Sequence, residues 1–186
     1  MRYETFNLEV HDVFKVAKLV YDVDFRTFDM LFKNSNKAID TIANDLKKEK
    51  TDDYFKVILD DDEEIVGMLR LYTSKTSHKF YLKSIRLLIV EILDYFVLCD
   101  IKKDDLYVAE IAIDEKLRGQ GLGKKVLFDV IEYAKSKGYR RVILDADFRN
   151  SGAIALYEKL GFKEFNKKRL KLGSFERGMV NMELIL

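Results

Sequence analysis

The chain has 186 residues, of which 48% are hydrophobic and 35% are charged, and its formal net charge is +1. These values are typical of one globular domain and give no electrostatic reason to expect binding to nucleic acid or to an anionic membrane surface. The single cysteine, Cys99, excludes an intrachain disulfide, and the first residues carry no apolar signal segment. We therefore expect one domain over residues 1–186, a cytoplasmic location and no membrane-spanning segment.

The first half of the chain predicts a strand, two helices and then two more strands. Tyr3–Val10 predicts a strand, and His11–Asp22 has apolar residues at helical spacing. Lys37–Glu49 predicts a second helix. Tyr54–Leu59 and Glu64–Tyr72 predict two strands of a hairpin around an acidic turn.

The second half predicts a longer series of elements with the same kinds of pattern. In chain order these are a helix at Ile85–Leu98, a strand at Leu106–Ile113, a helix at Lys124–Lys137, a strand at Arg141–Ala146, a helix at Ser151–Leu160 and a final pair of strands near Phe162–Arg169 and Met179–Leu186.

A glycine-rich turn, Arg118-Gly119-Gln120-Gly121-Leu122-Gly123, stands between the strand Leu106–Ile113 and the helix that follows it. Such a turn presents unpaired backbone N–H groups at the positive end of a helix, which predicts an anion site, most often for phosphate. The spacing excludes the dinucleotide fingerprint, because Lys124 stands where the third glycine is required. It also excludes the P-loop, because no serine or threonine follows the lysine and the upstream glycine is missing.

The remaining pattern, Arg-x-x-Gly-x-Gly after a strand, resembles the pyrophosphate loop of the GNAT acyl-CoA N-acetyltransferases. The segment Asn150–Phe162 resembles the second signature of that family, Asn-x-x-Ala-x-x-Leu-Tyr-x-x-x-Gly-Phe. Both motifs stand in the family's order, and the resemblance covers residues 105–165. It implies an α/β (α+β) GNAT fold, with a central mixed twisted sheet of about seven strands flanked by helices. The helix Ile85–Leu98 would be an addition between the third and fourth strands.

The resemblance implies that acetyl-CoA binds at the glycine turn and at the end of the strand before it. The residues carried over to the cofactor site are Ile111, Ala112, Ile113, Arg118, Gly119, Gln120, Gly121, Leu122, Gly123, Lys124, Asn150 and Tyr157. Backbone N–H groups of residues 111–113 would polarise the thioester carbonyl. Lys124 also fits a solvated helix face, and Asn150 is also a favourable N-cap residue for the helix after it.

Three side chains are candidates for proton transfer. Tyr157 matches the tyrosine that protonates the leaving thiolate in the family, although it also falls on the apolar face of its helix. Glu110 and Asp145 interrupt apolar strands, where an ionised carboxylate is costly unless it faces water or a partner. Several small-amine acetyltransferases carry an acid at the position of Glu110. The ribosomal-protein alanine acetyltransferases carry a glutamate base where this chain has the shorter Asp145. Glu110 is the first candidate for the base and Asp145 the second.

The function implied by the resemblance is direct transfer of an acetyl group from acetyl-CoA to a primary amine. The helix Ile85–Leu98 and the aromatic, acidic segment Tyr21–Phe32 favour a small-molecule acceptor, because they would form the walls of a pocket. The segment Tyr21–Phe32 also fits an amphipathic helix or a core loop. A peptide N-terminus or a lysine is an alternative acceptor, and a non-catalytic acyl-CoA-binding module is an alternative function. A homodimer through Ile85–Leu98 is a further hypothesis. We expect no metal, because His11 and His78 do not form a ligand pair.

Overall fold

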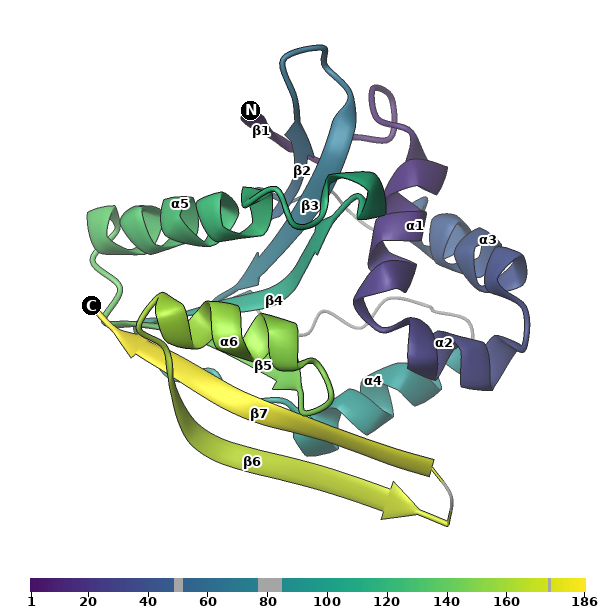
Figure 1. Cartoon of the computed structure of the whole chain (residues 1–186). Coiled ribbons are helices and arrows are strands. Elements are labelled where there is room, and N and C mark those ends of the chain that lie inside the picture. The colour runs from purple at the N-terminus through teal and green to yellow at the C-terminus, as the bar shows by residue number, and fades with distance from the viewer. Residues whose placement is uncertain (49–51, 77–84, 174) are drawn as a thin grey trace. The chain divides into compact units, whose positions relative to one another are not determined.

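The computed structural model describes residues 1–48, 52–76, 85–173 and 175–186 (Figure 1). The elements in chain order are β1 (Arg2–Thr5), α1 (Val13–Val23), α2 (Phe25–Phe32), α3 (Ser35–Leu46), β2 (Phe55–Leu59), β3 (Ile65–Tyr72), α4 (Ile85–Val97), β4 (Asp105–Ile113), the 3-10 helix η1 (Glu115–Leu117), α5 (Leu122–Ser136), β5 (Arg141–Asp147), α6 (Ser151–Lys159), β6 (Lys163–Leu172) and β7 (Phe175–Ile185).

The strands form one seven-stranded sheet in the order β1-β2-β3-β4-β5-β7-β6. The β4–β5 pair is parallel, and the pairs β1–β2, β2–β3, β5–β7 and β6–β7 are antiparallel. The sheet is therefore mixed, and the expected α/β fold class is confirmed. The added helix between the third and fourth strands is confirmed as α4.

The residues group into two compact units, each made of three stretches of chain. The first unit contains Met1–Leu71, His78–Val90 and Glu110–Gly123, and the second contains Tyr72–Ser77, Glu91–Ala109 and Lys124–Leu186. The strand β4 begins in the second unit and ends in the first, whereas α5 begins in the first and continues in the second. A single domain over the whole chain stays a prediction.

The first unit has an apolar core built from its three N-terminal helices and the strands β2 and β3. Buried members from these elements and from β4 include Val16, Phe28, Ile42, Met68 and Ala112. Leu87 and Val90 of α4 belong to the same cluster, so the first half of α4 packs in this unit. The helices bury the positions that their apolar spacing of three and four residues selects.

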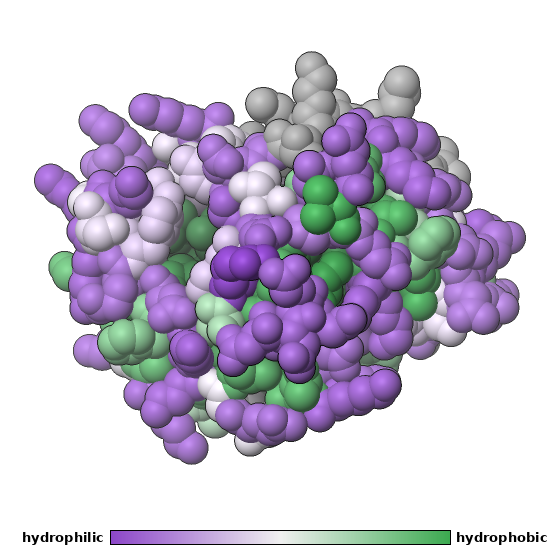
Figure 2. All heavy atoms as spheres, turned by 90° about the horizontal axis from the view of Figure 1, so that it is seen from above, coloured by the Kyte–Doolittle hydropathy of each residue, from purple (hydrophilic) through white to green (hydrophobic). Residues whose placement is uncertain are grey.

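The second unit has its core along the strands β5 and β7. Ile143, Leu144 and Met182 are almost completely buried there, and α5 buries its apolar face from Val126 to Ala134. The strands β6 and β7 form a long antiparallel hairpin (Figure 1). On the face seen in Figure 2, hydrophilic residues predominate and hydrophobic ones show between them, which is usual for a protein surface.

The N-terminal elements differ from the sequence expectation at the first strand. The strand expected over Tyr3–Val10 ends at Thr5, because a turn begins at Asn7, whose side chain accepts a hydrogen bond from the N–H of Glu9 at 2.9 Å. The short helix α2 lies in the segment Tyr21–Phe32, for which an amphipathic helix was one of the alternatives, and Phe25, Phe28 and Phe32 recur in it at helical spacing. In the described part of the chain, no helix is both long enough and apolar enough to cross a membrane.

Candidate active site

The glycine turn connects β4, through η1, to the first residue of α5. Gly119 and Gly121 have φ angles of 79° and 83°, a conformation that residues with a Cβ rarely adopt. A Cβ placed on either glycine would meet no atom within 4 Å. The turn therefore uses glycine for its backbone conformation and leaves open space beside it.

The start of α5 offers unpaired backbone donors beside this turn. Helices α1, α3 and α6 are capped by the side chains of Asp12, Asn34 and Asn150. Helix α5 begins directly after Gly121, which has no side chain to accept these hydrogen bonds. The first N–H groups of a helix have no intrahelical acceptor, so they can bind an anion together with the positive end of the dipole. The exposed Lys124 adds a cation at the same end.

Arg118 anchors the turn to two other elements of the first unit. Its Nε donates to the carbonyl oxygen of Ile113 at 3.0 Å, and its Nη2 donates to Oδ2 of Asp22 on α1 at 3.2 Å. Lys18 binds the same Asp22 carboxylate at 2.9 Å. Arg118 thus holds the turn in place, and its contact with a cofactor stays a prediction.

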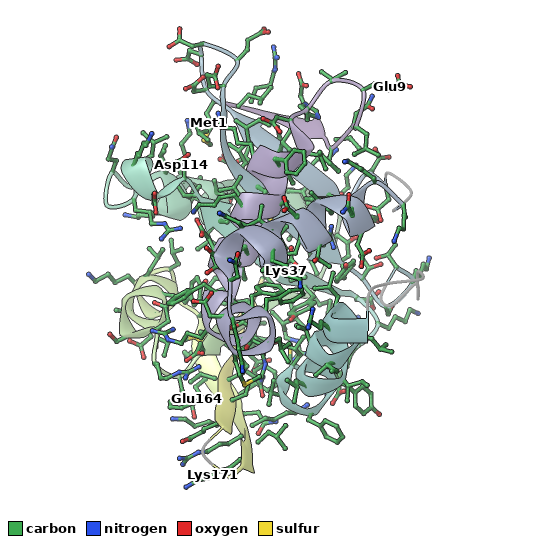
Figure 3. The ribbon with its side chains drawn as sticks, turned by 90° about the vertical axis from the view of Figure 1, so that its right-hand side faces the viewer. Met1, Glu9, Lys37, Asp114, Glu164 and Lys171 are labelled. Atoms are coloured by element: carbon green, nitrogen blue, oxygen red, sulfur yellow. The ribbon has the colours of Figure 1, made fainter. Side chains whose placement is uncertain are left out.

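The segment between β4 and the turn is also fixed by local hydrogen bonds. Asp114, which Figure 3 labels, caps η1 by accepting from the N–H of Lys116 at 3.0 Å. The backbone N–H of Asp114 donates to the carbonyl of Val66 on β3 at 2.9 Å. The side chain of Gln120 donates to the carbonyl of Lys116 at 3.4 Å, so it turns back along the segment.

The end of β4 extends beyond its pairing with β5. The parallel register runs from Asp105–Arg141 to Val108–Leu144. Glu110 and residues 111–113 follow the last pair, on the part of β4 that leads into the glycine turn. Ala112 and Ile113 are buried, and Ile111 is half-buried. This placement is compatible with the expected thioester site at residues 111–113.

Glu110 has a carboxylate oxygen that forms no hydrogen bond within the described part of the chain. Its Oε2 is buried and accepts no hydrogen bond from any described residue. The nearest charged group that forms an ion pair with it is Arg70 on β3, whose Nε lies 3.9 Å from Oε2. Because a buried polar atom without a partner is unusual in a folded protein, Oε2 is a candidate for contact with a ligand or a water molecule.

Asp145, in contrast, is surrounded by donors of the second unit. Its Oδ2 accepts from the N–H of Cys99 at 3.0 Å and from the hydroxyl of Tyr107 at 2.8 Å. Its Oδ1 accepts from Nδ2 of Asn181, which also donates to the carbonyl of Val97 at 3.1 Å. Asp145 therefore links β4, β5 and β7 to the end of α4.

Tyr157 is buried on α6, where its ring lies 6.1 Å from that of Phe162. Burial raises the pKa of the Tyr157 hydroxyl to about 12, so the phenol stays protonated at neutral pH. No described residue forms a hydrogen bond with this hydroxyl. Asn150 caps α6 by accepting from the N–H of Ala153 at 3.1 Å, which confirms its expected capping role. Both residues belong to the second unit.

Other polar side chains singled out by the sequence have internal partners. Tyr21 donates to Asp29 at 2.6 Å, and burial together with this carboxylate raises the pKa of Tyr21 to about 12. Cys99 is buried, and burial and the nearby Asp145 raise the pKa of its thiol well above its ordinary value. His11 contacts Glu4 at 3.2 Å, and His78 lies outside the described residues. The described residues contain no group of three or more His, Cys, Asp or Glu side chains suited to a metal ion.

Two residues with a place in these networks were missed by sequence reasoning. Arg70 interrupts the apolar strand Ile65–Tyr72, and Asn181 interrupts the apolar strand at Met179–Leu186. A polar residue within an apolar strand was the signal that selected Glu110 and Asp145. The same signal would have selected Arg70 and Asn181.

The model of the acetyltransferase (GNAT) family matches residues 20–162, which is more than half of the chain. An uncharacterized N-acetyltransferase of Methanocaldococcus jannaschii is 40% identical over 76 residues, which are 37% of this chain and 34% of that protein. The [ribosomal protein bS18]-alanine N-acetyltransferase of Escherichia coli is 34% identical over 74 residues, which are 40% of this chain and 50% of that enzyme. The chain thus spans half or less of the length of these relatives.

Solved structures share the fold over the whole chain at low sequence identity. An N-acetyltransferase from Staphylococcus aureus Mu50 has a TM-score of 0.70 and 21% identity, covering 99% of this chain and 100% of that one. An acetyltransferase from Bacillus subtilis in complex with CoA has a TM-score of 0.60 and 17% identity, covering 100% of this chain and 98% of that one.

Proposed function

Because the chain belongs to the acetyltransferase (GNAT) family, we propose that it transfers the acetyl group of acetyl-CoA directly to the primary amine of a small molecule. The observation that carries this proposal is the buried, unpartnered Oε2 of Glu110 on the strand that leads into the glycine turn. Glu110 and the glycine turn belong to the same compact unit, which supports a proton-accepting carboxylate and a phosphate-binding turn on one segment of the chain.

Acetyl-CoA has an activated thioester, and it also has phosphate groups through which a protein can bind it. The open backbone at Gly119 and Gly121 and the uncapped start of α5 suit those phosphates. Lys124 would add charge at the same place. Backbone groups of residues 111–113 would hold the acetyl carbonyl, and Asn150 would contact the cofactor besides capping α6.

Glu110 is proposed as the base. An amine with a pKa near 10.4 must lose a proton before it can attack, and at pH 7 this costs about 4–5 kcal/mol. The Oε2 of Glu110 would accept that proton, directly or through one water. The nitrogen lone pair then forms the bond to the acetyl carbon while the carbon–sulfur bond breaks and CoA leaves as a thiolate. The nitrogen releases its second proton to water as the amide forms. Asp145 is the weaker candidate, because three donors already occupy its oxygens.

Tyr157 is proposed as the acid that returns a proton to the leaving thiolate. Its hydroxyl is protonated at neutral pH, because burial raises its pKa to about 12. It has no competing hydrogen bond from any described residue. The assignment of this role follows the position of Tyr157 in the Asn150–Phe162 motif.

The packing of α2 and the first half of α4 supports a small-molecule acceptor. Phe28, Phe32 and Val90 belong to the apolar cluster that also contains Ala112 of β4. Arg86 lies over the ring of Phe32 at 5.2 Å. Elements whose apolar side chains share one core cluster with β4, the strand of the proposed thioester site, would enclose an acceptor more closely than an open peptide groove does.

A peptide N-terminus is the second candidate acceptor. The observation in its favour is the 34% identity to a [ribosomal protein bS18]-alanine N-acetyltransferase over 74 residues. The two proposals differ in the acceptor and share the cofactor and the chemistry.

The test is thiol release from acetyl-CoA across polyamines, amino acids, aminoglycosides and short peptides with free N-termini. Release with a small amine and none with peptides is the expected result. Release with peptides alone would replace the small-molecule acceptor by a protein. No release with any amine, while acetyl-CoA still raises the melting temperature, would indicate an acyl-CoA-binding module and overturn the transferase proposal.

A further inference from the structure

The buried Arg70 and the half-buried Glu110 form an ion pair in the first unit. The Nε of Arg70 on β3 lies 3.9 Å from Oε2 of Glu110 on β4, and the two side chains are 10% and 26% exposed. This separation is within the range of an ion pair but longer than the 2.7–3.2 Å of an N–H···O hydrogen bond. Arg70 therefore acts on the carboxylate by charge and leaves the lone pairs of Oε2 unoccupied.

The position of Arg70 is fixed by its own strand and by an aromatic ring. Arg70 pairs with Phe55 of β2 in the antiparallel register. Its guanidinium lies 4.1 Å from the centre of the Phe55 ring, which is a close cation–π contact. The guanidinium therefore contacts the Phe55 ring while its Nε lies at ion-pair distance from Oε2.

Asp145 shows the contrasting case, a carboxylate that is held by hydrogen bonds and not by an ion pair. There, Tyr107, Cys99 and Asn181 donate hydrogen bonds, which stabilise the charge but occupy the oxygens. A base must instead be held as a carboxylate and still accept a proton from the substrate. A cation at ion-pair distance satisfies both requirements.

We propose that Arg70 is a positioning residue for the acetyl-transfer reaction: it holds the Glu110 carboxylate by charge and leaves Oε2 free for the acceptor amine. This inference rests on the proposed role of Glu110 as the base. The step that Arg70 serves is the transfer of a proton from the acceptor ammonium to Oε2. The amine nitrogen then bonds to the acetyl carbon, the carbon–sulfur bond breaks and the CoA thiolate leaves.

The experiment compares two acceptors that differ in their need for a base. The first is the amine found by the thiol-release panel, and the second is its aminooxy analogue, whose nitrogen is already unprotonated at pH 7. Loss of base catalysis lowers the rate of acetylation of the amine by about 10²-fold or more and lowers the rate with the aminooxy compound much less. A variant that only disturbs folding or cofactor binding slows both acceptors equally.

The variants are Glu110→Gln, Arg70→Met and Arg70→Lys, with Arg2→Met as the matched control. Arg2 is an arginine of the same unit whose exposed side chain pairs with Glu4 and Glu63. We expect Glu110→Gln and Arg70→Met to lower the acetylation rate of the amine much more than that of the aminooxy analogue. For Arg70→Met the rate with the amine should fall by about 10-fold. We expect Arg70→Lys to keep most of the amine rate, because it keeps the charge, and Arg2→Met to match the wild type. The KM for acetyl-CoA should stay the same in all four.

Two results would overturn these assignments, and they are distinguishable. Selective slowing in Glu110→Gln with equal slowing of both acceptors in Arg70→Met would leave Glu110 as the base and remove Arg70 from this role. Equal slowing of both acceptors in Glu110→Gln would remove Glu110 itself. If Arg70→Met melts below the assay temperature, Arg70→Gln gives the same comparison, because it removes the charge and keeps a polar side chain.

Discussion

Asp145 and Glu110 are both carboxylates on strands, but their oxygens have different surroundings. Asp145 accepts hydrogen bonds from Tyr107, Cys99 and Asn181. The Oε2 of Glu110 is buried and has no hydrogen-bond partner in the described part of the chain. Buried donors that lose their acceptor cost free energy, whereas an unoccupied acceptor does not stabilise the fold. The two residues should therefore respond differently to substitution.

Replacing Asp145 by alanine should destabilise the protein. The change removes the carboxylate that accepts three hydrogen bonds, each worth about 1–3 kcal/mol when its loss is not compensated, and we expect a loss of about 3–5 kcal/mol in the free energy of unfolding. Urea unfolding measures this loss. Glu110→Gln is the matched control and should lose less than about 1 kcal/mol. Equal losses in the two variants would contradict a structural role for Asp145.

Replacing Tyr157 by phenylalanine should lower turnover far more than acetyl-CoA affinity. The ring and its packing against Phe162 are kept, and only the hydroxyl is removed. General acid catalysis contributes about 10²–10⁴-fold, and a thiolate is a modest base, so we expect a fall in kcat of about 10²-fold. Steady-state kinetics and a binding titration with acetyl-CoA give the two values. A variant with unchanged kcat would remove Tyr157 from the mechanism.

At the scale of elements, the end of β4, the glycine turn and the start of α5 form the candidate cofactor site. Replacing Gly121 by glutamate should abolish acetyl-CoA binding, because the side chain would fill the open space and repel phosphate. Backbone strain at a positive φ would add a cost of about 1–2 kcal/mol in stability. A calorimetric titration with acetyl-CoA measures the binding.

Gly138 provides the control for that strain. It also has a positive φ, of 75°, and a Cβ there would meet no atom within 4 Å, but it follows the last turn of α5. Gly138→Glu should therefore lose similar stability and keep its affinity for acetyl-CoA. If Gly121→Glu folds and binds normally, the phosphate-site assignment is wrong.

The two capping asparagines allow the roles of Asn150 to be separated. Asn150 and Asn34 each accept a hydrogen bond from a backbone N–H of the helix that follows, at 3.1 Å and 2.9 Å. Asn150→Ala and Asn34→Ala should each lose about 1 kcal/mol of stability. A weaker affinity for acetyl-CoA in Asn150→Ala alone would support the cofactor contact, and equal affinities would leave Asn150 as a cap.

The stability of the whole molecule should fall at alkaline pH, in part because of Tyr157. Its pKa is raised from 10 to about 12 by burial, so folding favours the protonated form. The stabilisation is complete below pH 10 and is lost as the pH rises from 10 to 12, by about 2–3 kcal/mol. Urea unfolding across this range should show a shallower decline for Tyr157→Phe. Phe162→Leu, which removes no titratable group, should decline as steeply as the wild type.

Local patterns were sufficient for much of the fold. The hairpin β2–β3, the added helix α4, and every strand and α-helix from β4 to β7 were expected with bounds that differ by a few residues, whereas the short η1 was not expected. The N-terminal strand and α2 were harder to predict from the sequence, because a turn at Asn7 competes with the strand and α2 has only eight residues. Short elements carry few periods of a pattern, so tertiary packing decides them.

The sequence by itself determined the family, the glycine turn, the cap at Asn150 and the candidates Glu110, Asp145 and Tyr157, since these depend on residues close together along the chain. Only the tertiary structure decided which carboxylate keeps an unoccupied oxygen. It also joined Arg118 to Asp22, 96 residues away, and set Arg70 beside Glu110. Strand register and helix packing bring such side chains together. The spacing of residues along the sequence does not predict the distances between their oxygen and nitrogen atoms.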